Sequence, residues 1–208
     1  MTPLLSTSYL PPIPYIAACV KSGTIIFEKH EHYIKQTFRN RALIYGANGI
    51  LPLIIPVQHD QLFNIPIHEV RVATDSHWQK IHWRSIVSAY RNSAFFEYFE
   101  DDFDAFYRVK ANTLYAFNLG LMNLIFRSIG ADIHIAHTSS YQKEVVDVND
   151  LRHDFHSYKQ VNRSSSTSEN RYRQVFSDRF EFIPNLSIVD LLFNEGPNCM
   201  NYITSIYQ

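Results

Sequence analysis

The residues of this chain best suited to chemistry gather in one short segment, Tyr33–Arg41. Its lysine, asparagine and two arginines can bind anions or amides, and its tyrosine can donate a proton. The segment follows Thr24–Phe27, an apolar run that predicts a buried strand, and polar residues beyond a strand often form a binding site. The sequence therefore predicts a ligand site here, although no catalytic signature names the reaction.

Within this segment, Arg41 and Asn40 are the candidates for holding a substrate. A guanidinium binds phosphate or carboxylate through two parallel hydrogen bonds, and an asparagine side chain can orient an amide. The alternative is a structural role, in which they tie the segment to other elements. Tyr33 and Lys35 face the same way in an extended chain and could supply a proton and a positive charge. A packed aromatic ring and a solvated lysine are the alternative for this pair.

Two further candidates stand in apolar surroundings. His82 falls on the buried stripe of a predicted helix, where it is either a hydrogen-bonded core residue or a general base. Asp190 interrupts an apolar run, and Ser187 before it predicts a capping box, in which each side chain binds the backbone N–H of the other residue. A pairing of Asp190 with Arg41 is the other hypothesis for this carboxylate.

The remaining candidates lie near the ends of predicted strands. Ser139 and Tyr141 follow one strand and could line the acceptor side of a cleft. His30 and His32 would share one face of an extended segment, a spacing that metal sites use. No HExxH motif or Cys–His set accompanies them, so we predict no metal site, and the sequence names no cofactor.

Composition argues against several classes of protein. The chain has 208 residues, of which 46% are apolar, enough for one domain with a well-formed core. Its net charge of −1 argues against binding to a nucleic-acid backbone. No apolar run is long enough for a membrane span, and the two cysteines lack metal or redox spacing, so we expect reduced thiols in a cytoplasmic protein. The motifs of serine hydrolases, P-loop NTPases and dinucleotide-binding oxidoreductases are absent.

Hydrophobic periodicity predicts strands interleaved with helices, and therefore a single α/β (or α+β) domain over residues 1–208 with helices packed on a mixed sheet. Asn48-Gly49 predicts a hairpin, and Gly23 and Gly130 predict helix ends. The Ser-rich stretch 161–171 predicts a mobile loop. The predicted strands cover residues 4–9, 24–27, 42–45, 50–57, 68–73 and 133–136, and the predicted helices cover 15–21, 78–90, 94–107, 114–129 and 186–193.

Short motifs follow one another along almost the whole chain. They are Tyr9-Leu10-Pro11-Pro12 with Pro14-Tyr15; Tyr33, Lys35, Asn40 and Arg41; Gly46-Ala47-Asn48-Gly49; Ile55-Pro56-Val57; Trp78, Lys80, His82, Tyr90 and Ala94; Ser139 and Tyr141; and residues 186–196. In this order, they resemble the WbqC-like family of bacterial proteins. Two features depart from the family. Lys29 and His30 stand where many members carry an acidic pair, and the Ser-rich stretch replaces a further segment of longer members.

The resemblance implies a role in the biosynthesis of O-antigen, another surface polysaccharide or a related small molecule, and glycine transfer has been suggested for some members. The leading hypothesis is an acyl or aminoacyl transferase in which Arg41 and Asn40 hold the donor and His82 or Tyr33 moves protons. We expect a small-molecule substrate, nucleotide-linked or carrier-linked, and the sequence leaves a homo-oligomer open. The alternatives are a non-catalytic binding or scaffold protein of a biosynthetic complex and a histidine-based metal enzyme.

Overall fold

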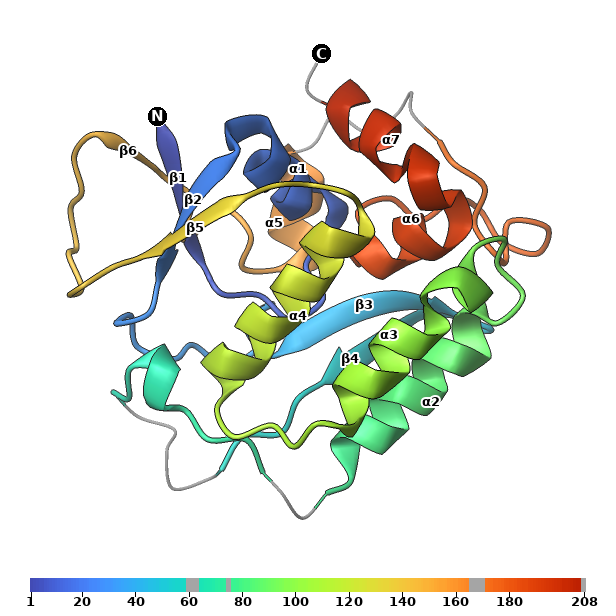
Figure 1. Cartoon of the computed structure of the whole chain (residues 1–208), viewed down its shortest axis with the longest axis horizontal. Helices are drawn as coiled ribbons and strands as arrows, with labels where there is room; N and C mark the ends of the chain where they lie inside the picture. Colours follow the sequence, from blue (N-terminus) through green and yellow to red (C-terminus); the bar gives the residue numbers. More distant parts are fainter. Residues whose placement is uncertain (59–63, 74–75, 165–170, 207–208) are drawn as a thin grey trace.

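The computed structural model describes residues 1–58, 64–73, 76–164 and 171–206. It confirms the α/β class, with a parallel sheet, an antiparallel hairpin and flanking helices (Figure 1). The strands are β1 (Thr2–Ser6), β2 (Thr24–Glu28), β3 (Arg41–Gly46), β4 (Gly49–Ile54), β5 (His134–His137) and β6 (Val148–Asp150). The helices are α1 (Ile13–Ser22), α2 (Trp78–Tyr90), α3 (Phe96–Arg108), α4 (Leu114–Ser128), α5 (Tyr158–Ser164), α6 (Ile188–Glu195) and α7 (Cys199–Ser205), with the 3₁₀ turns η2 (Ile67–Glu69) and η3 (Gly196–Asn198).

Local sequence signals set most of these boundaries. Gly23 ends α1 in the left-handed conformation, with φ of 68°, and its N–H binds the carbonyl of Cys19. The Thr113 side chain accepts from the backbone N–H of Ala116 and so begins α4. The predicted hairpin is confirmed as β3 and β4, joined by a turn in which Gly49 has φ of 100°.

The parallel sheet has the strand order β5–β2–β1–β6, and this order reverses at β1. The chain runs from β1 through α1 to β2, which lies on one side of β1, whereas β6 pairs with the other side. Leu4 is accordingly level with Ile26 of β2 and with Asp150 of β6. In open parallel sheets, ligands bind outside the carboxyl ends of the strands at such a reversal.

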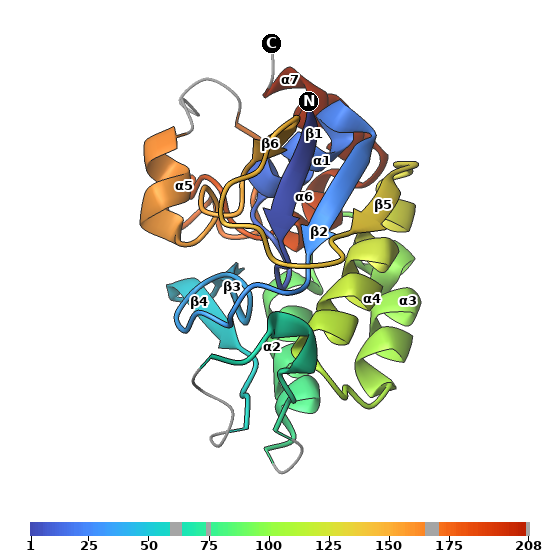
Figure 2. The ribbon, with the colours of Figure 1, turned by 90° about the vertical axis from the view of Figure 1, so that its left-hand side faces the viewer.

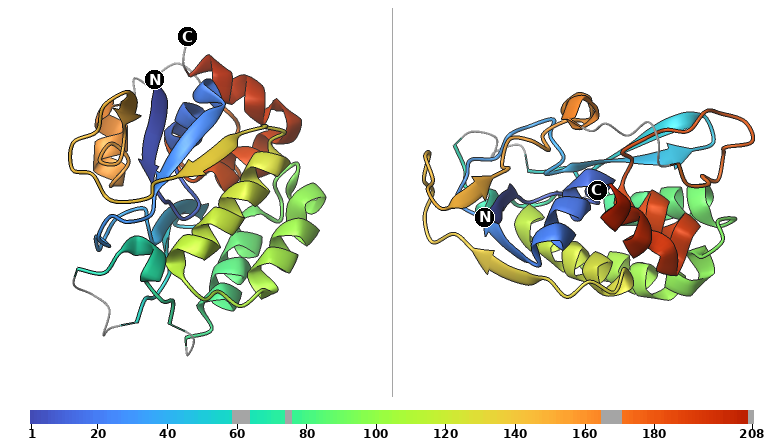
Figure 3. Two further views of the ribbon diagram at one scale, coloured as in Figure 1. Left: turned by 60° about the vertical axis from the view of Figure 1, so that its left-hand side comes forward. Right: turned by 90° about the horizontal axis from the view of Figure 1, so that it is seen from above.

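The remaining elements surround this sheet edge. The carboxyl ends of β1 and β2 point toward the hairpin and η2 (Figure 2). The hairpin and α5 lie on one side of the molecule, α3 and α4 lie on the other, and α1 lies between them (Figure 3). One continuous hydrophobic core joins these parts, and it includes side chains of α1, the hairpin, α2, α3, α4 and α6.

Two predicted strands are wrong in part or in whole. The first strand covers Thr2–Ser6 rather than residues 4–9, because the next segment turns away from the sheet: the N–H of Tyr9 binds the carbonyl of Phe38, and Leu10 has a positive φ of 40°. Residues 68–73 form part of η2 and then two isolated bridges rather than a strand. Each bridge joins only one residue of this segment to one residue of a neighbouring segment, so no continuous ladder forms. The alternation of apolar residues in the segment reflects burial in the core instead.

Two other predictions have mixed outcomes. The capping box of α6 forms only in half: the Ser187 hydroxyl accepts from the backbone N–H of Val189 at 3.4 Å, but the Asp190 carboxylate binds other partners. Of the predicted mobile loop, residues 161–164 belong to α5 and residues 165–170 lie outside the described residues. Cys19 and Cys199 are both buried free thiols, as predicted.

Candidate functional site

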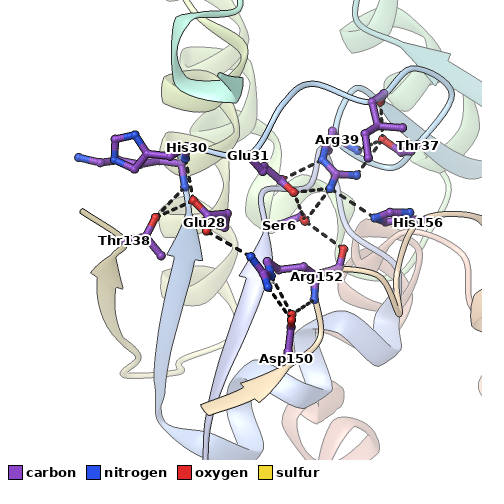
Figure 4. Close-up of polar contacts among 12 residues, drawn as sticks. Ser6, Glu28, His30, Glu31, Thr37, Arg39, Thr138, Asp150, Arg152 and His156 are labelled. Atoms are coloured by element: carbon purple, nitrogen blue, oxygen red, sulfur yellow. Dashed lines mark hydrogen bonds and ion pairs between the residues drawn. The ribbon is translucent and has the colours of Figure 1, made fainter. Parts of the chain in front are cut away.

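A polar residue stands at or just after the carboxyl end of every strand of the parallel sheet. Ser6 ends β1, Glu28 ends β2, Asp150 ends β6, and Thr138 follows β5. Figure 4 shows that these side chains converge on two arginines, Arg39 and Arg152, in one network. Because the strands are parallel, residues far apart in the sequence meet at the carboxyl end of the sheet.

Arg39 forms one half of the network. Its Nε donates to Glu31 Oε1 at 2.9 Å, and its second terminal nitrogen donates to Glu31 Oε2 at 2.6 Å, so the ion pair is two-pronged. The same nitrogen donates to the Ser6 hydroxyl at 2.7 Å and lies 3.3 Å from His156 Nε2. Arg39 and Glu31 are both buried, with 2% and 5% of their surface exposed, so each charge depends on the other for its stability.

Arg152 forms the other half and sits between two carboxylates. Its Nε donates to Asp150 Oδ1 at 2.9 Å and a terminal nitrogen donates to Asp150 Oδ2 at 2.6 Å, while Glu28 lies 3.5 Å away. The hydrogen bonds from Arg152 hold the pKa of Asp150 below its ordinary value. Glu28 also accepts from the hydroxyl of Thr138 at 2.7 Å, which links β2 to the end of β5.

The two halves enclose a cavity of about 10 Å³, which is room for about one water molecule. Its lining includes Ser6, Arg39, Arg152 and Phe155, and it therefore lies at the reversal between β1 and β6. The ring of Tyr141 packs against Arg152, with the guanidinium carbon 5.3 Å from the ring centroid. Tyr141 is half exposed, and Arg152 also donates to the backbone carbonyls of Gln142 and Lys143 at 2.8 and 3.2 Å.

His156 is the second titratable group beside Arg39, after Glu31. Burial, and then the positive charge of Arg39, lower the pKa of His156 to about 4. The imidazole is therefore neutral at pH 7 and accepts from the guanidinium through Nε2. The site offers buried cations, buried carboxylates and hydroxyls side by side, a combination that can bind a carboxylate and an ammonium group of one small molecule.

The chain also matches a known protein family. Residues 7–168 match the WbqC-like protein family. The chain belongs to the WbqC-like family. Over 96% of this chain and 96% of the relative, it is 25% identical to the uncharacterized protein Rv1507c of Mycobacterium tuberculosis. The two therefore align over nearly their full lengths. No solved structure matches the chain.

The candidate residues predicted from the sequence lie at several separate points in the structure. Tyr33 and Arg41 lie near the network: burial raises the pKa of the Tyr33 phenol, and the positive charges of Arg41 and Arg39 partly oppose that rise. The Arg41 Nε is buried without a hydrogen-bond partner in the described structure. Asn40 is buried and donates to the carbonyl of Ile55 at 2.9 Å, whereas Lys35 is exposed.

His82 and Asp190 lie elsewhere. His82 is buried on α2, where its Nδ1 lies 2.9 Å from the hydroxyl of Tyr9, and burial lowers its pKa to about 4. Asp190 accepts from the side chains of Tyr90, Tyr172 and Gln174, and its predicted pairing with Arg41 does not form. His82 is therefore the hydrogen-bonded core residue given as its structural alternative, whereas the Asp190 carboxylate binds core side chains instead of either expected partner.

The predicted strand-end pair divides between solvent and the network. Tyr141 packs on Arg152, as described, whereas Ser139 is exposed beside Thr138. His30 stacks edge-to-face on His68 at 4.9 Å, and His32 is exposed. Among the residues that the structure describes, no group of three histidine, cysteine or acidic side chains could hold a metal ion, and no helix is long and apolar enough to cross a membrane.

Sequence reasoning missed the charged centre of the site. Arg39 lies in the same segment as Arg41, but only Arg41 matches the family motif, so the sequence predicts a site role for Arg41 and none for Arg39. Glu28, Asp150 and Arg152 carry a weaker signal, which is a charged residue directly after a run with strand periodicity. Such a residue at the end of a parallel strand is a candidate site residue, provided that the strands are known to be parallel.

Proposed function

We propose that this WbqC-like protein is a transferase of surface-polysaccharide or related small-molecule biosynthesis, which moves an acyl or aminoacyl group such as glycine. One observation carries the proposal: buried arginines and carboxylates meet at the reversal point of a parallel sheet, where such folds bind ligands. The cavity of about 10 Å³ admits only about one water molecule, so a donor enters only when the side chains that line it move apart.

In this proposal the charges of the network exchange partners. The donor is an activated aminoacyl ester or thioester, whose ammonium group takes the place of Arg152 on Asp150, so that Arg152 can donate to the acyl oxygen. The acceptor hydroxyl attacks the acyl carbon and gives its proton to Glu28, and the bond from the acyl carbon to the carrier breaks. Tyr33 is protonated at neutral pH, and the positive charges of Arg41 and Arg39 oppose the rise of its pKa by burial, which helps the phenol to donate a proton to the leaving group. Arg41 supplies positive charge beside it. His82 and Asp190 support the core around the site.

Ligand binding is the first test. Purified protein is screened by thermal shift against amino acids, acyl-CoAs, nucleotides and nucleotide sugars. A ligand at 100 times its Kd should add about 2.7 kcal/mol of stability, or about 5–10 °C for a chain of this size. Ser6→Ala should reduce that shift, because Ser6 contacts Glu31 and Arg39, whereas the matched Ser128→Ala on α4 should retain it.

Group transfer is the second test. The ligand that binds is incubated with candidate acceptor sugars, and the product is followed by mass spectrometry. Tyr33→Phe should keep the thermal shift and slow transfer by about 10²-fold, as the loss of a general acid does, while the exposed Tyr98→Phe should transfer at the normal rate. Full activity of Tyr33→Phe would remove Tyr33 from the mechanism.

A second candidate function is a non-catalytic small-molecule-binding or scaffold protein. It is favoured by the pairing of the charges of Arg39 and Arg152 with carboxylates and by the small size of the cavity. This candidate predicts a ligand-induced shift without transfer to any acceptor. If no ligand gave a thermal shift, the result would count against both functions at the carboxyl end of the parallel sheet.

A further inference from the structure

A second cavity, of about 620 Å³, opens between the first half of α2 and the end of α3. Its volume lies in the range of small-molecule sites. Its lining residues differ from those of the cavity at the carboxyl end of the parallel sheet. The helices α2 and α3 also lie across the molecule from β1, β2 and β6 (Figure 1). It is therefore a separate cavity from the one in the function proposed above.

Aromatic side chains form one wall of this cavity and are held firmly. Trp83 lies nearly parallel to Tyr107, with ring centroids 5.8 Å apart, and Trp78 meets Phe117 edge-to-face at 5.0 Å. The hydroxyl of Tyr107 is fixed by a 2.7 Å hydrogen bond to that of Tyr9. These contacts fix the rings before any ligand arrives, which lowers the entropic cost of binding a flat apolar group against them.

Positive charge dominates the rest of the lining. Lys80 and Arg84 lie one turn apart on the same face of α2, and Arg108 and Lys110 stand opposite at the end of α3. Among the residues that the structure describes, Asp104 is the one carboxylate in the lining, and it pairs with Arg108 at 2.6 Å. Within the described residues, no carboxylate lies within ion-pair distance of Lys80, Arg84 or Lys110.

This concentration of charge is unusual for the chain. In the described part of the cavity wall, four cations face one carboxylate, although the whole protein has a net charge of −1. Like charges held around one concave space repel one another, and a multiply charged anion relieves that repulsion. Phosphate oxygens also accept several hydrogen bonds from lysine and arginine at once.

We propose that this cavity, lined by Trp78, Trp83, Lys80, Arg84 and Lys110, binds a nucleoside diphosphate or a molecule that carries one. The aromatic wall packs against the base, and the cations at the rim bind the diphosphate. Neither element alone selects this class, since an apolar wall suits many ligands and a cationic rim suits any polyanion. Their meeting in one cavity of nucleotide size selects a flat base joined to a charged diphosphate.

Trp78 and Trp83 are the two tryptophans of the chain, and both line the cavity. Intrinsic tryptophan fluorescence therefore reports on this site directly. Titration of the full-length protein with uridine diphosphate and adenosine diphosphate should give a saturable change in emission. Inorganic pyrophosphate and the free nucleosides should bind at least about tenfold more weakly than the diphosphates, because each supplies one half of the recognition. Rising salt should weaken binding, because the rim is exposed.

Charge-removal variants locate the site. Arg84→Ala with Lys110→Ala removes two exposed cations, one from each side of the rim, and should weaken the diphosphate about tenfold or more. Arg127→Ala removes an exposed cation near the end of α4 and should bind normally. Unchanged fluorescence with both diphosphates would overturn the proposal. So would equal affinity for pyrophosphate, or normal binding by the double variant. These results are independent of the Ser6 and Tyr33 variants, which test the site at the carboxyl end of the parallel sheet.

Discussion

Asp190 allows the sharpest test of the electrostatics of this core. The side chain is 0% exposed, and its oxygens accept from Tyr90, Tyr172 and Gln174. Burial raises its pKa from 3.8 to about 6, since the loss of hydration outweighs the stabilisation from the three donors. The folded protein therefore binds this proton more tightly than the unfolded chain does.

The sign of the pH effect follows from that shift. A raised folded pKa contributes stability that is fully present below the ordinary value of 3.8 and is lost as the pH rises through about 6. The full loss is about 3 kcal/mol, because one pKa unit corresponds to about 1.4 kcal/mol. About 2 kcal/mol of it should fall between about pH 4 and pH 7, which is about 4–8 °C in Tm for a chain of this size.

Asp190→Asn removes the titration and keeps the shape of the side chain. Because the wild type loses stability as the pH rises, the free energy of unfolding of the variant should gain about 2 kcal/mol relative to the wild type between about pH 4 and pH 7. At every pH, the variant should also be destabilised by about 1–3 kcal/mol, because the NH₂ group of the new asparagine faces the NH₂ group of Gln174. Urea unfolding of both proteins across this range measures the difference. Asp102→Asn, on an exposed position of α3, is the matched control and should give a flat difference. A flat difference for Asp190→Asn as well would refute the account of the buried carboxylate.

Three other substitutions test separate parts of the structure. Arg39→Met leaves Glu31 buried without its cation and should lower the free energy of unfolding by about 3–5 kcal/mol, and adding Glu31→Leu should recover part of that loss in chemical denaturation. His82 has a pKa lowered to about 4, so the wild type should lose stability as the pH falls from about 6.5, while His82→Gln should lose less over the same range in urea titrations. At Gly196, φ is 51° and a Cβ would meet a phenylalanine ring at 2.5 Å, so Gly196→Ala should cost about 2 kcal/mol or more, whereas Gly130→Ala, with φ of 70° and open space around it, should cost about 1 kcal/mol in the same assay.

Local chemistry in the sequence determined many of the elements. The helix that ends at Gly23, the hairpin at Asn48-Gly49 and the helix begun by Thr113 each depend on backbone conformations and hydrogen bonds within a few residues. Short-range signals of this kind are present in the chain whatever the rest of the fold does. The order of the short motifs also indicated the family, because that order can be read directly from the sequence.

Tertiary structure alone decided which charged residues form the site. Ser6 and Arg152 are separated by 146 positions, and they meet only because β1 and β6 are parallel neighbours. Arg39 and Arg41 look alike in the sequence, but Arg39 is buried against Glu31, whereas Arg41 is the first residue of β3. Residue type sets which charges a chain carries. Burial and strand pairing set which of them lose water and must find partners, and that is a property of the whole fold.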